Sequence, residues 1–273
     1  MASGRPARPT ERAPSPLARR WPWLIRLFGW YVSWFIKRHF HGLRVAERRV
    51  ASSLPDGPVI IAINHPSWWD PLVAMVLAGL MGPRRHVAPM DASALEQYRF
   101  FERLGLFGIE PGTAVGLRRL VQVARQTLQH RDAVMWLTPQ GSFADVRQRP
   151  LALQPGVGVL AHQLAGGTIV PVAIEYPFWN ERLPEILVRF GEPIAVNDGA
   201  ERTAREWTQL VEERLTATQD ALREQAVARD AAAFEEVVVG RAGVSWLYDL
   251  WRRARAWWRG ESFSAEHGGL VKS

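Results

Sequence analysis

The segment from residue 59 to residue 80 constrains the fold most, because a buried strand, a short bend and an apolar helix follow one another within it. Val59-Ile60-Ile61-Ala62 is a β-branched run typical of a strand buried on both faces. The apolar stretch 72–80 predicts a helix. Asp70 and Pro71 mark its start, with a carboxylate at the cap position and proline at the first helical position. The order of these elements indicates an α/β protein.

His65 and Asp70 stand at the two ends of the bend, five positions apart. If the bend folds the imidazole back over the helix start, Asp70 accepts the Nδ1 proton and leaves Nε2 free as a base. A neutral imidazole, with an unperturbed pKa of about 6.5, can take a proton from an alcohol near neutral pH. The spacing is equally compatible with a structural interpretation, in which Asp70 only caps the helix and His65 only ends the strand.

The His-x4-Asp pattern after a buried strand resembles the first motif of the glycerolipid acyltransferases, the family that includes lysophosphatidate acyltransferase. Three later stretches resemble further motifs of that family in the same order, namely Trp136-Leu137-Thr138-Pro139-Gln140-Gly141-Ser142, Ile169-Val170-Pro171-Val172-Ala173 and Val188-Arg189-Phe190-Gly191-Glu192-Pro193-Ile194. The resemblance covers residues 45–220. The first motif alone is a weak signal, whereas four motifs in order are a strong one.

The resemblance implies an α/β domain with a mostly parallel or mixed central sheet flanked by helices. It implies direct transfer of a fatty acyl group from a thioester of CoA or acyl carrier protein to a lipid hydroxyl, without a metal or a further cofactor. His65 would be the base and Asp70 the residue that orients it. Main-chain amides around Gly141 and Ser142 would hold the oxyanion. The third-motif candidates are Pro139, Gln140, Gly141 and Ser142.

The chain departs from the family pattern where that pattern usually binds a phosphate. The second-motif region, 106–112, ends in Glu110-Pro111-Gly112 where an arginine is usual, and Phe143 stands where many members have another. Gln140 replaces the family's glutamate, a variant that resembles carotenoid-modifying acyltransferases such as chlorobactene lauroyltransferase. An unpaired phosphate dianion in a partly buried site is unfavourable. The usual phosphate clamp is therefore largely missing.

Two accounts of the acceptor stay open. In the favoured one the acceptor lacks a phosphate and is a glycolipid, a carotenoid or another lipid alcohol. In the other, Arg147 and Arg149 take over the clamp and the chain is a 1-acyl-glycerol-3-phosphate acyltransferase; solvated loop charges are the plain alternative for these arginines. Asn64 is a further acceptor-binding candidate. A catalytically silent lipid-binding scaffold is the rival from another class, which the presence of both His65 and Asp70 disfavours.

The composition adds limits on chemistry and partners. The chain has no cysteine, which excludes a disulfide, a thiolate nucleophile and a cysteine metal site. It has 13 tryptophans and a net charge of +7. Tryptophans gather near both ends among aliphatic residues and arginines, a composition typical of the bilayer interface. We expect an anionic membrane surface as a partner, and no nucleic acid, for which no motif is present.

The chain divides into four expected parts. Residues 1–20 form a disordered basic lead-in, and 21–41 form a helix that lies in the membrane surface rather than crossing it. A signal peptide is the competing interpretation of 21–41, opposed by Arg26 inside the apolar region and by the lack of a small-residue cleavage site. The acyltransferase domain spans 42–235. The tail, 236–273, carries a basic amphipathic helix over 244–259 that contacts the membrane or a partner. We expect peripheral attachment to the cytoplasmic face of the cell membrane.

Periodicity predicts the remaining elements of the domain. Further strands are expected at 86–90, 133–137, 168–174 and 187–190, and helices at 92–104, 113–130, 155–165 and 205–222. Pro171 predicts that the strand 168–174 lies at an edge or carries a bulge.

Overall fold

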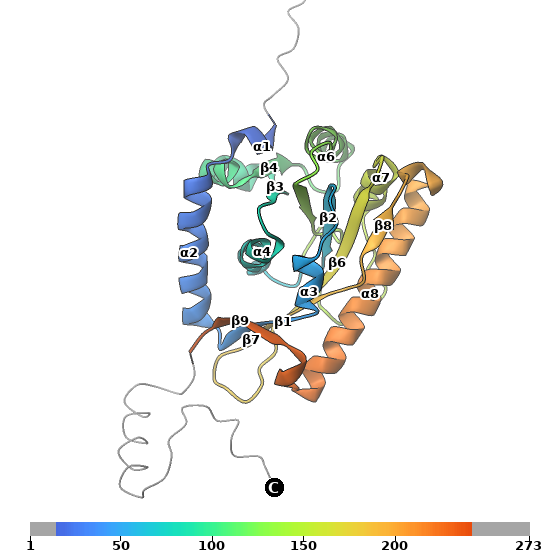
Figure 1. Cartoon of the computed structure of the whole chain (residues 1–273). Coiled ribbons are helices and arrows are strands. Elements are labelled where there is room, and N and C mark those ends of the chain that lie inside the picture. Colours follow the sequence, from blue (N-terminus) through green and yellow to red (C-terminus); the bar gives the residue numbers. More distant parts are fainter. Residues whose placement is uncertain (1–14, 242–273) are drawn as a thin grey trace, which may run out of the picture.

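A nine-stranded sheet runs through the computed structural model, which describes residues 15–241 of the chain (Figure 1). The strand order is β4-β3-β5-β2-β6-β7-β1-β9, with β8 paired to β6. Pairing is parallel except at β6–β7, β6–β8 and β1–β9. The strands are β1 (Gly42–Ala46), β2 (Val59–Ile63), β3 (Arg85–Asp91), β4 (Leu106–Ile109), β5 (Ala133–Leu137), β6 (Gly167–Glu175), β7 (Glu185–Phe190), β8 (Ile194–Val196) and β9 (Glu235–Val239). The predicted α/β fold with a mostly parallel sheet is confirmed.

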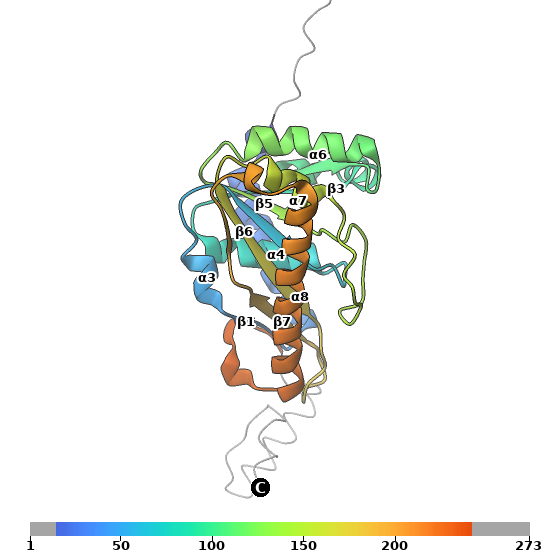
Figure 2. The same ribbon diagram turned by 90° about the vertical axis from the view of Figure 1, so that its right-hand side faces the viewer.

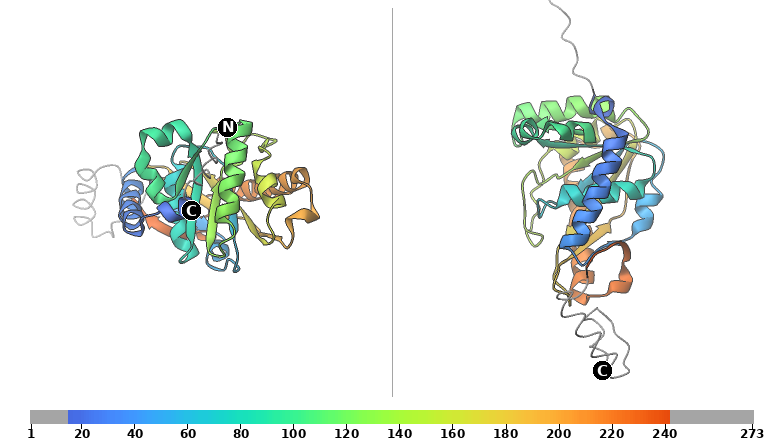
Figure 3. Two further views of the ribbon diagram at one scale, coloured as in Figure 1. Left: turned by 90° about the horizontal axis from the view of Figure 1, so that it is seen from above. Right: turned by 90° about the vertical axis from the view of Figure 1, so that its left-hand side faces the viewer.

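Helices cover both faces of this sheet. One face carries α2 and α4, and the other carries α6, α7 and α8, as the view along the sheet in Figure 1 and the turned view in Figure 2 show. Figure 3 shows α2 at the outer edge of the described part of the molecule. The helices are α1 (Pro16–Arg19), α2 (Pro22–His39), α3 (Arg48–Ser52), α4 (Asp70–Ala78), α5 (Ala92–Gln97), α6 (Ala114–Thr127), α7 (Gly156–His162) and α8 (Ala204–Ala228), with 3-10 turns η1 (Gly79–Met81), η2 (Arg99–Leu104), η3 (Gly199–Glu201) and η4 (Ala231–Ala233).

The central strand β2 is apolar at every position because both of its faces are covered. Ile61 and Ile63 pack with the α4 side of the core, while Ile60 and Ala62 pack with the side formed by α6 and α7. All of its residues are buried. β2 is paired with β5 on one side and with β6 on the other, so its carboxyl end, from which His65 emerges, is held from both sides.

Pro171 lies in the interior of β6, so the prediction of an edge strand or a bulge is wrong. On one side it pairs with Ala62 of β2. On the other side β6 changes partner around this residue, from β8 at Ile169 to β7 at Val172. The carbonyl of Pro171 accepts from Gly191 N in the chain between these partners. The missing N–H of proline therefore falls in the gap between two strands and interrupts no ladder.

Two expected boundaries need correction. Residues 15–20 are ordered, because α1 forms there and buries Leu17, so the disordered lead-in expected over 1–20 is wrong for this part. β9 pairs with β1, so the sheet of the domain extends beyond residue 235 to Val239. The helix expected at 244–259 lies outside the described residues. Within the described range, no helix combines the length and apolarity needed to cross a membrane.

Candidate active site

The candidate site lies where β2 ends and α4 begins, at the carboxyl end of the parallel strands. Such crevices are where open α/β sheets place their sites. His65 follows β2 directly after Asn64, and α4 starts at Asp70. The helix cap is Trp69, one residue earlier than the sequence indicated, and Asp70 occupies the first helical position. Its carboxylate is therefore free to bond within the bend.

The two side chains named by the His-x4-Asp pattern contact each other. His65 Nδ1 lies 2.6 Å from Asp70 Oδ2. The carboxylate of Asp70 is 3% exposed and the imidazole of His65 is 19% exposed. Asp70 Oδ2 also accepts the main-chain N–H of Ser67 at 3.0 Å. An ionised carboxylate can only accept, so His65 donates from Nδ1 and Nε2 carries the free lone pair.

The third-motif loop is fastened to the main chain of His65. The His65 N–H donates to Gln140 Oε1 at 3.0 Å, and the His65 carbonyl accepts from Ala144 N at 2.9 Å. Pro139 and Gln140 are buried. The side chain of Gln140 thus positions the histidine, a task for which an amide oxygen serves as well as the carboxylate expected from the family.

Gly141 and Ser142 have different roles in this loop. The Gly141 N–H donates to the Thr138 carbonyl at 2.9 Å and closes a turn over residues 138–141. Gly141 itself has a φ of +74°, a conformation that glycine adopts without strain. The Gly141 amide is therefore already bonded, and the expectation of oxyanion donors around Gly141 and Ser142 stays a prediction for the amides that follow it. The N–H groups of Ser142 and Phe143 have no acceptor within residues 15–241. They precede Ala144, whose N–H bonds to the His65 carbonyl, so they are candidate donors close to His65 in the chain of the loop.

Phe143 lies over the imidazole. The centroids of the two rings are 4.5 Å apart, and 62% of Phe143 is exposed. An apolar ring therefore lies beside the catalytic candidate at the position where the family pattern would place a guanidinium.

The three acceptor-binding candidates are occupied within the protein. The Asn64 amide bonds both the N–H and the carbonyl of Ile174, and the residue is 1% exposed, so it ties β2 to β6 rather than facing an acceptor. Arg147 makes a two-pronged pair with Asp145, and its hydrogen bonds lower the pKa of that carboxyl. Arg149 pairs with Asp220 of α8 at 2.6 Å.

Tyr176 belongs to the site and was not found from the sequence. Its hydroxyl donates to Asp70 Oδ1 at 2.6 Å. Burial, together with the charge of Asp70, raises the pKa of Tyr176 well above its ordinary value. In the sequence, Tyr176 shows only as a tyrosine directly after a buried strand. The pairing of β6 with β2 is what brings it next to Asp70.

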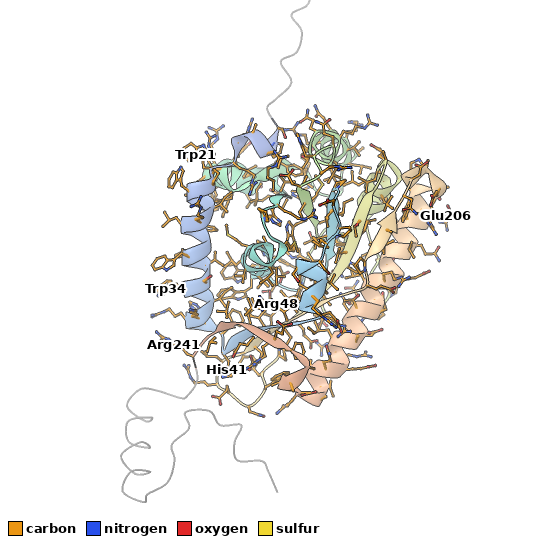
Figure 4. The ribbon with its side chains drawn as sticks, viewed as in Figure 1. Trp21, Trp34, His41, Arg48, Glu206 and Arg241 are labelled. Atoms are coloured by element: carbon orange, nitrogen blue, oxygen red, sulfur yellow. The ribbon has the colours of Figure 1, made fainter. Side chains whose placement is uncertain are left out.

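An aromatic cluster connects the site to α2. Trp69 contacts Phe35 of α2 at 5.2 Å and Phe40 at 4.8 Å between ring centroids. The outer side of α2 carries a stripe of exposed side chains, and Figure 4 shows Trp34 on this outer side. The stripe consists of Trp23 (59% exposed), Leu27 (56%), Trp30 (70%) and Trp34 (48%). Within residues 15–241 no three His, Asp or Glu side chains are grouped so that they could hold a metal ion.

Comparisons with known proteins agree with this picture. A protein-family model described as Acyltransferase matches residues 37–175. Among solved structures, the chain is similar to the 1-acyl-sn-glycerophosphate (LPA) acyltransferase PlsC from Thermotoga maritima, with a TM-score of 0.50 and 14% identity, over 73% of this chain and 78% of that one. No curated protein matches the chain. At this identity the structural similarity describes a shared fold.

Proposed function

The chain belongs to the acyltransferase family, and we propose that it transfers a fatty acyl group from a thioester to the hydroxyl of a lipid acceptor that lacks a phosphate. The observation that carries the proposal is the contact of His65 Nδ1 with Asp70 Oδ2 inside the range matched by the family model. The donor is the thioester of CoA or of acyl carrier protein.

In the proposed reaction His65 Nε2 takes the proton of the acceptor hydroxyl as its oxygen attacks the thioester carbonyl carbon. Asp70 stabilises the imidazolium that forms. The amides of Ser142 and Phe143 donate to the oxyanion. Collapse of this intermediate breaks the C–S bond, and the imidazolium returns the proton to the leaving thiolate. The products are an ester and a free thiol. Within residues 15–241 the hydroxyls of Ser67 and Ser142 are bonded to no His, Asp or Glu side chain, so the proposed transfer is direct, without an acyl-enzyme.

The surroundings of His65 support an acceptor without phosphate. Phe143 covers the imidazole with an apolar ring, and Arg147 and Arg149 are each paired with a carboxylate. A phosphate would have to displace Asp145 or Asp220 from these pairs before it gained a partner of its own. A glycolipid, a carotenoid or another lipid alcohol has no such requirement.

A lysophospholipid acceptor is the second candidate. The solved structure with a similar fold is titled as an acyltransferase of 1-acyl-sn-glycerophosphate. The side chain of Arg147 is 81% exposed and sits in the loop that bonds to His65, so it could exchange Asp145 for a phosphate.

The protein is proposed to work at an anionic membrane surface, attached through α2. The stripe of Trp23, Leu27, Trp30 and Trp34 follows helical spacing and points away from the core. The exposed Arg26 and Lys37 flank it. Amphipathic aromatic side chains and basic residues together are typical of a helix lying in the interface. Trp69 joins α2 to the site, so the same membrane would present both acceptor and acyl chain there.

The acceptor is tested with purified protein, labelled acyl-CoA and a panel of acceptors in vesicles, comparing lipid alcohols and glycolipids with lysophosphatidate. The proposal expects faster transfer to at least one acceptor without phosphate. Transfer to lysophosphatidate alone would support the second candidate. No product from any acceptor, with either CoA or carrier-protein thioesters, would instead support a lipid-binding scaffold.

A further inference from the structure

The carboxylate of Asp70 has a third partner that the proposed reaction has not used so far. Oδ2 receives His65 Nδ1 and the Ser67 amide, while Oδ1 receives only the hydroxyl of Tyr176, at 2.6 Å. The side chain of Asp70 is 3% exposed, so Oδ1 meets the hydroxyl of Tyr176 rather than bulk solvent. Tyr176 is thus the donor that completes the shell of the carboxylate behind the candidate base.

The fold holds Tyr176 in this place from two sides. β6 pairs in parallel with β2 up to Ile63 and Val172, and the Asn64 amide then bonds both main-chain groups of Ile174. Tyr176 follows two residues later. Its ring packs against Phe40, 5.8 Å away between centroids, and Phe40 in turn contacts Trp69 beside Asp70. The hydroxyl therefore meets Oδ1 without a flexible segment between them.

We propose that Tyr176 is a positioning residue, whose hydroxyl holds the Asp70 carboxylate in its ionised, correctly oriented form and so tunes the basicity of His65. This inference rests on the proposed function of the His65–Asp70 pair.

The physical reason is the sharing of negative charge. A hydroxyl that donates to Oδ1 draws charge away from Oδ2 and favours the ionised carboxylate. Without it, the carboxylate holds a proton more readily, and the imidazolium facing Oδ2 is stabilised more strongly. Both changes keep the pair protonated to higher pH. Removing the hydroxyl should therefore move the acid limb of the pH–rate profile upward.

The test compares kcat/KM from pH 5 to pH 9 for wild type, Tyr176→Phe and the control Tyr98→Phe. Tyr98 is exposed, and its hydroxyl makes no hydrogen bond within the described part of the chain. We expect Tyr176→Phe to shift the acid limb upward by about half to one pH unit, which is about a 3- to 10-fold loss at acid pH. The alkaline plateau and KM for the acyl thioester should stay within about twofold, because the substitution changes the protonation of the pair and removes no group that binds the thioester.

Other ionisable groups near the pair are unchanged by the substitution and contribute equally to both profiles. They are His39 on α2, which contacts Trp69, Glu175 beside Tyr176 on β6, and Asp145 and Arg147 in the loop that bonds to His65. A uniform loss at every pH would show that Tyr176 only supports the structure, and an unchanged profile would show that the hydroxyl has no effect. Either result overturns the inference.

A second variant keeps the inference testable if Tyr176→Phe does not fold. Biosynthetic replacement of the tyrosines by 3-fluorotyrosine keeps the ring and makes the hydroxyl a stronger donor. The acid limb should then move downward, and an unmoved limb contradicts the inference. A His65→Ala variant, measured alongside, separates the two claims. Its activity at wild-type level would refute the proposed function, whereas its inactivity together with a wild-type profile for Tyr176→Phe would refute only the role of Tyr176.

Discussion

The hydrogen bonds of Asp70 predict that asparagine and alanine at this position behave differently. An asparagine can place its oxygen where Oδ2 lies, keeping both His65 Nδ1 and the Ser67 amide as donors. Its NH2 group then meets the oxygen of Tyr176. Asp70→Asn should therefore retain the tautomer of His65 and lose only the negative charge. Asp70→Ala loses the charge and the bond that fixes the ring.

The magnitude follows from the charge that is removed. Two unit charges about 4 Å apart interact by about 4 kcal/mol at an effective dielectric constant near 20. Because the imidazole is partly exposed, screening reduces this energy, so we expect a loss of about 10- to 10³-fold in kcat for Asp70→Asn. For Asp70→Ala we expect the full loss of about 10²- to 10⁴-fold that general-base catalysis supplies.

The assay is the release of free thiol from acyl-CoA, read with a thiol reagent. The chain has no cysteine, so the protein itself gives no background signal. Asp132→Asn is the matched control, since Asp132 is an exposed partner of Arg85. Equal kcat for wild type and Asp70→Asn would refute the reasoning. A higher kcat for Asp70→Ala than for Asp70→Asn would also refute it.

Three further predictions concern the membrane, the acceptor and stability. Substituting Leu27 and Trp30 by serine should weaken binding to anionic vesicles, measured by sedimentation, by about tenfold or more per side chain, because burying one large apolar side chain contributes about 1.5–3 kcal/mol. The control is Val227→Ser on α8, where the valine is 78% exposed; vesicle binding should not change. In competition assays, Phe143→Arg should raise the ratio of lysophosphatidate acylation to lipid-alcohol acylation by about tenfold, because a hydrogen bond to a charged group contributes about 1.5–3 kcal/mol. An unchanged ratio would contradict the proposed role of Phe143. The hydrogen bond to Glu185 raises the pKa of His41 in the folded protein. The contribution of this pair to stability is therefore complete below the pKa of His41 in the unfolded chain and is lost as pH rises through its pKa in the folded protein. Thermal melts should show that Glu185→Gln lowers the melting temperature more at pH 5.5 than at pH 8.5.

The sequence predicted elements whose burial decides their structure. The strand 133–137 was predicted with the bounds it has, because an apolar run buried on both faces admits one interpretation. The resemblance to the glycerolipid acyltransferases is confirmed by the family match and the shared fold, while the comparison with carotenoid-modifying enzymes stays a prediction. The four motifs therefore identified the enzyme class from short segments alone.

The errors lie where distant segments decide the outcome. The helix expected over 92–104 breaks at Tyr98, where the backbone turns away between α5 and η2. β9 begins with Glu235 and Glu236 and does not read as a core strand; it forms because β1 offers an unpaired edge. Tyr176 is 106 positions from Asp70, so only the register of β6 on β2 reveals their contact.

The central claim is that the imidazole of His65 takes the acceptor proton during acyl transfer. It is tested most directly by single-turnover transfer from labelled acyl-CoA to the preferred lipid acceptor, for wild type and His65→Ala, with vesicle binding measured on the same samples. The account predicts a fall in transfer of at least about 10²-fold with vesicle binding unchanged. Transfer by His65→Ala at the wild-type rate would contradict it.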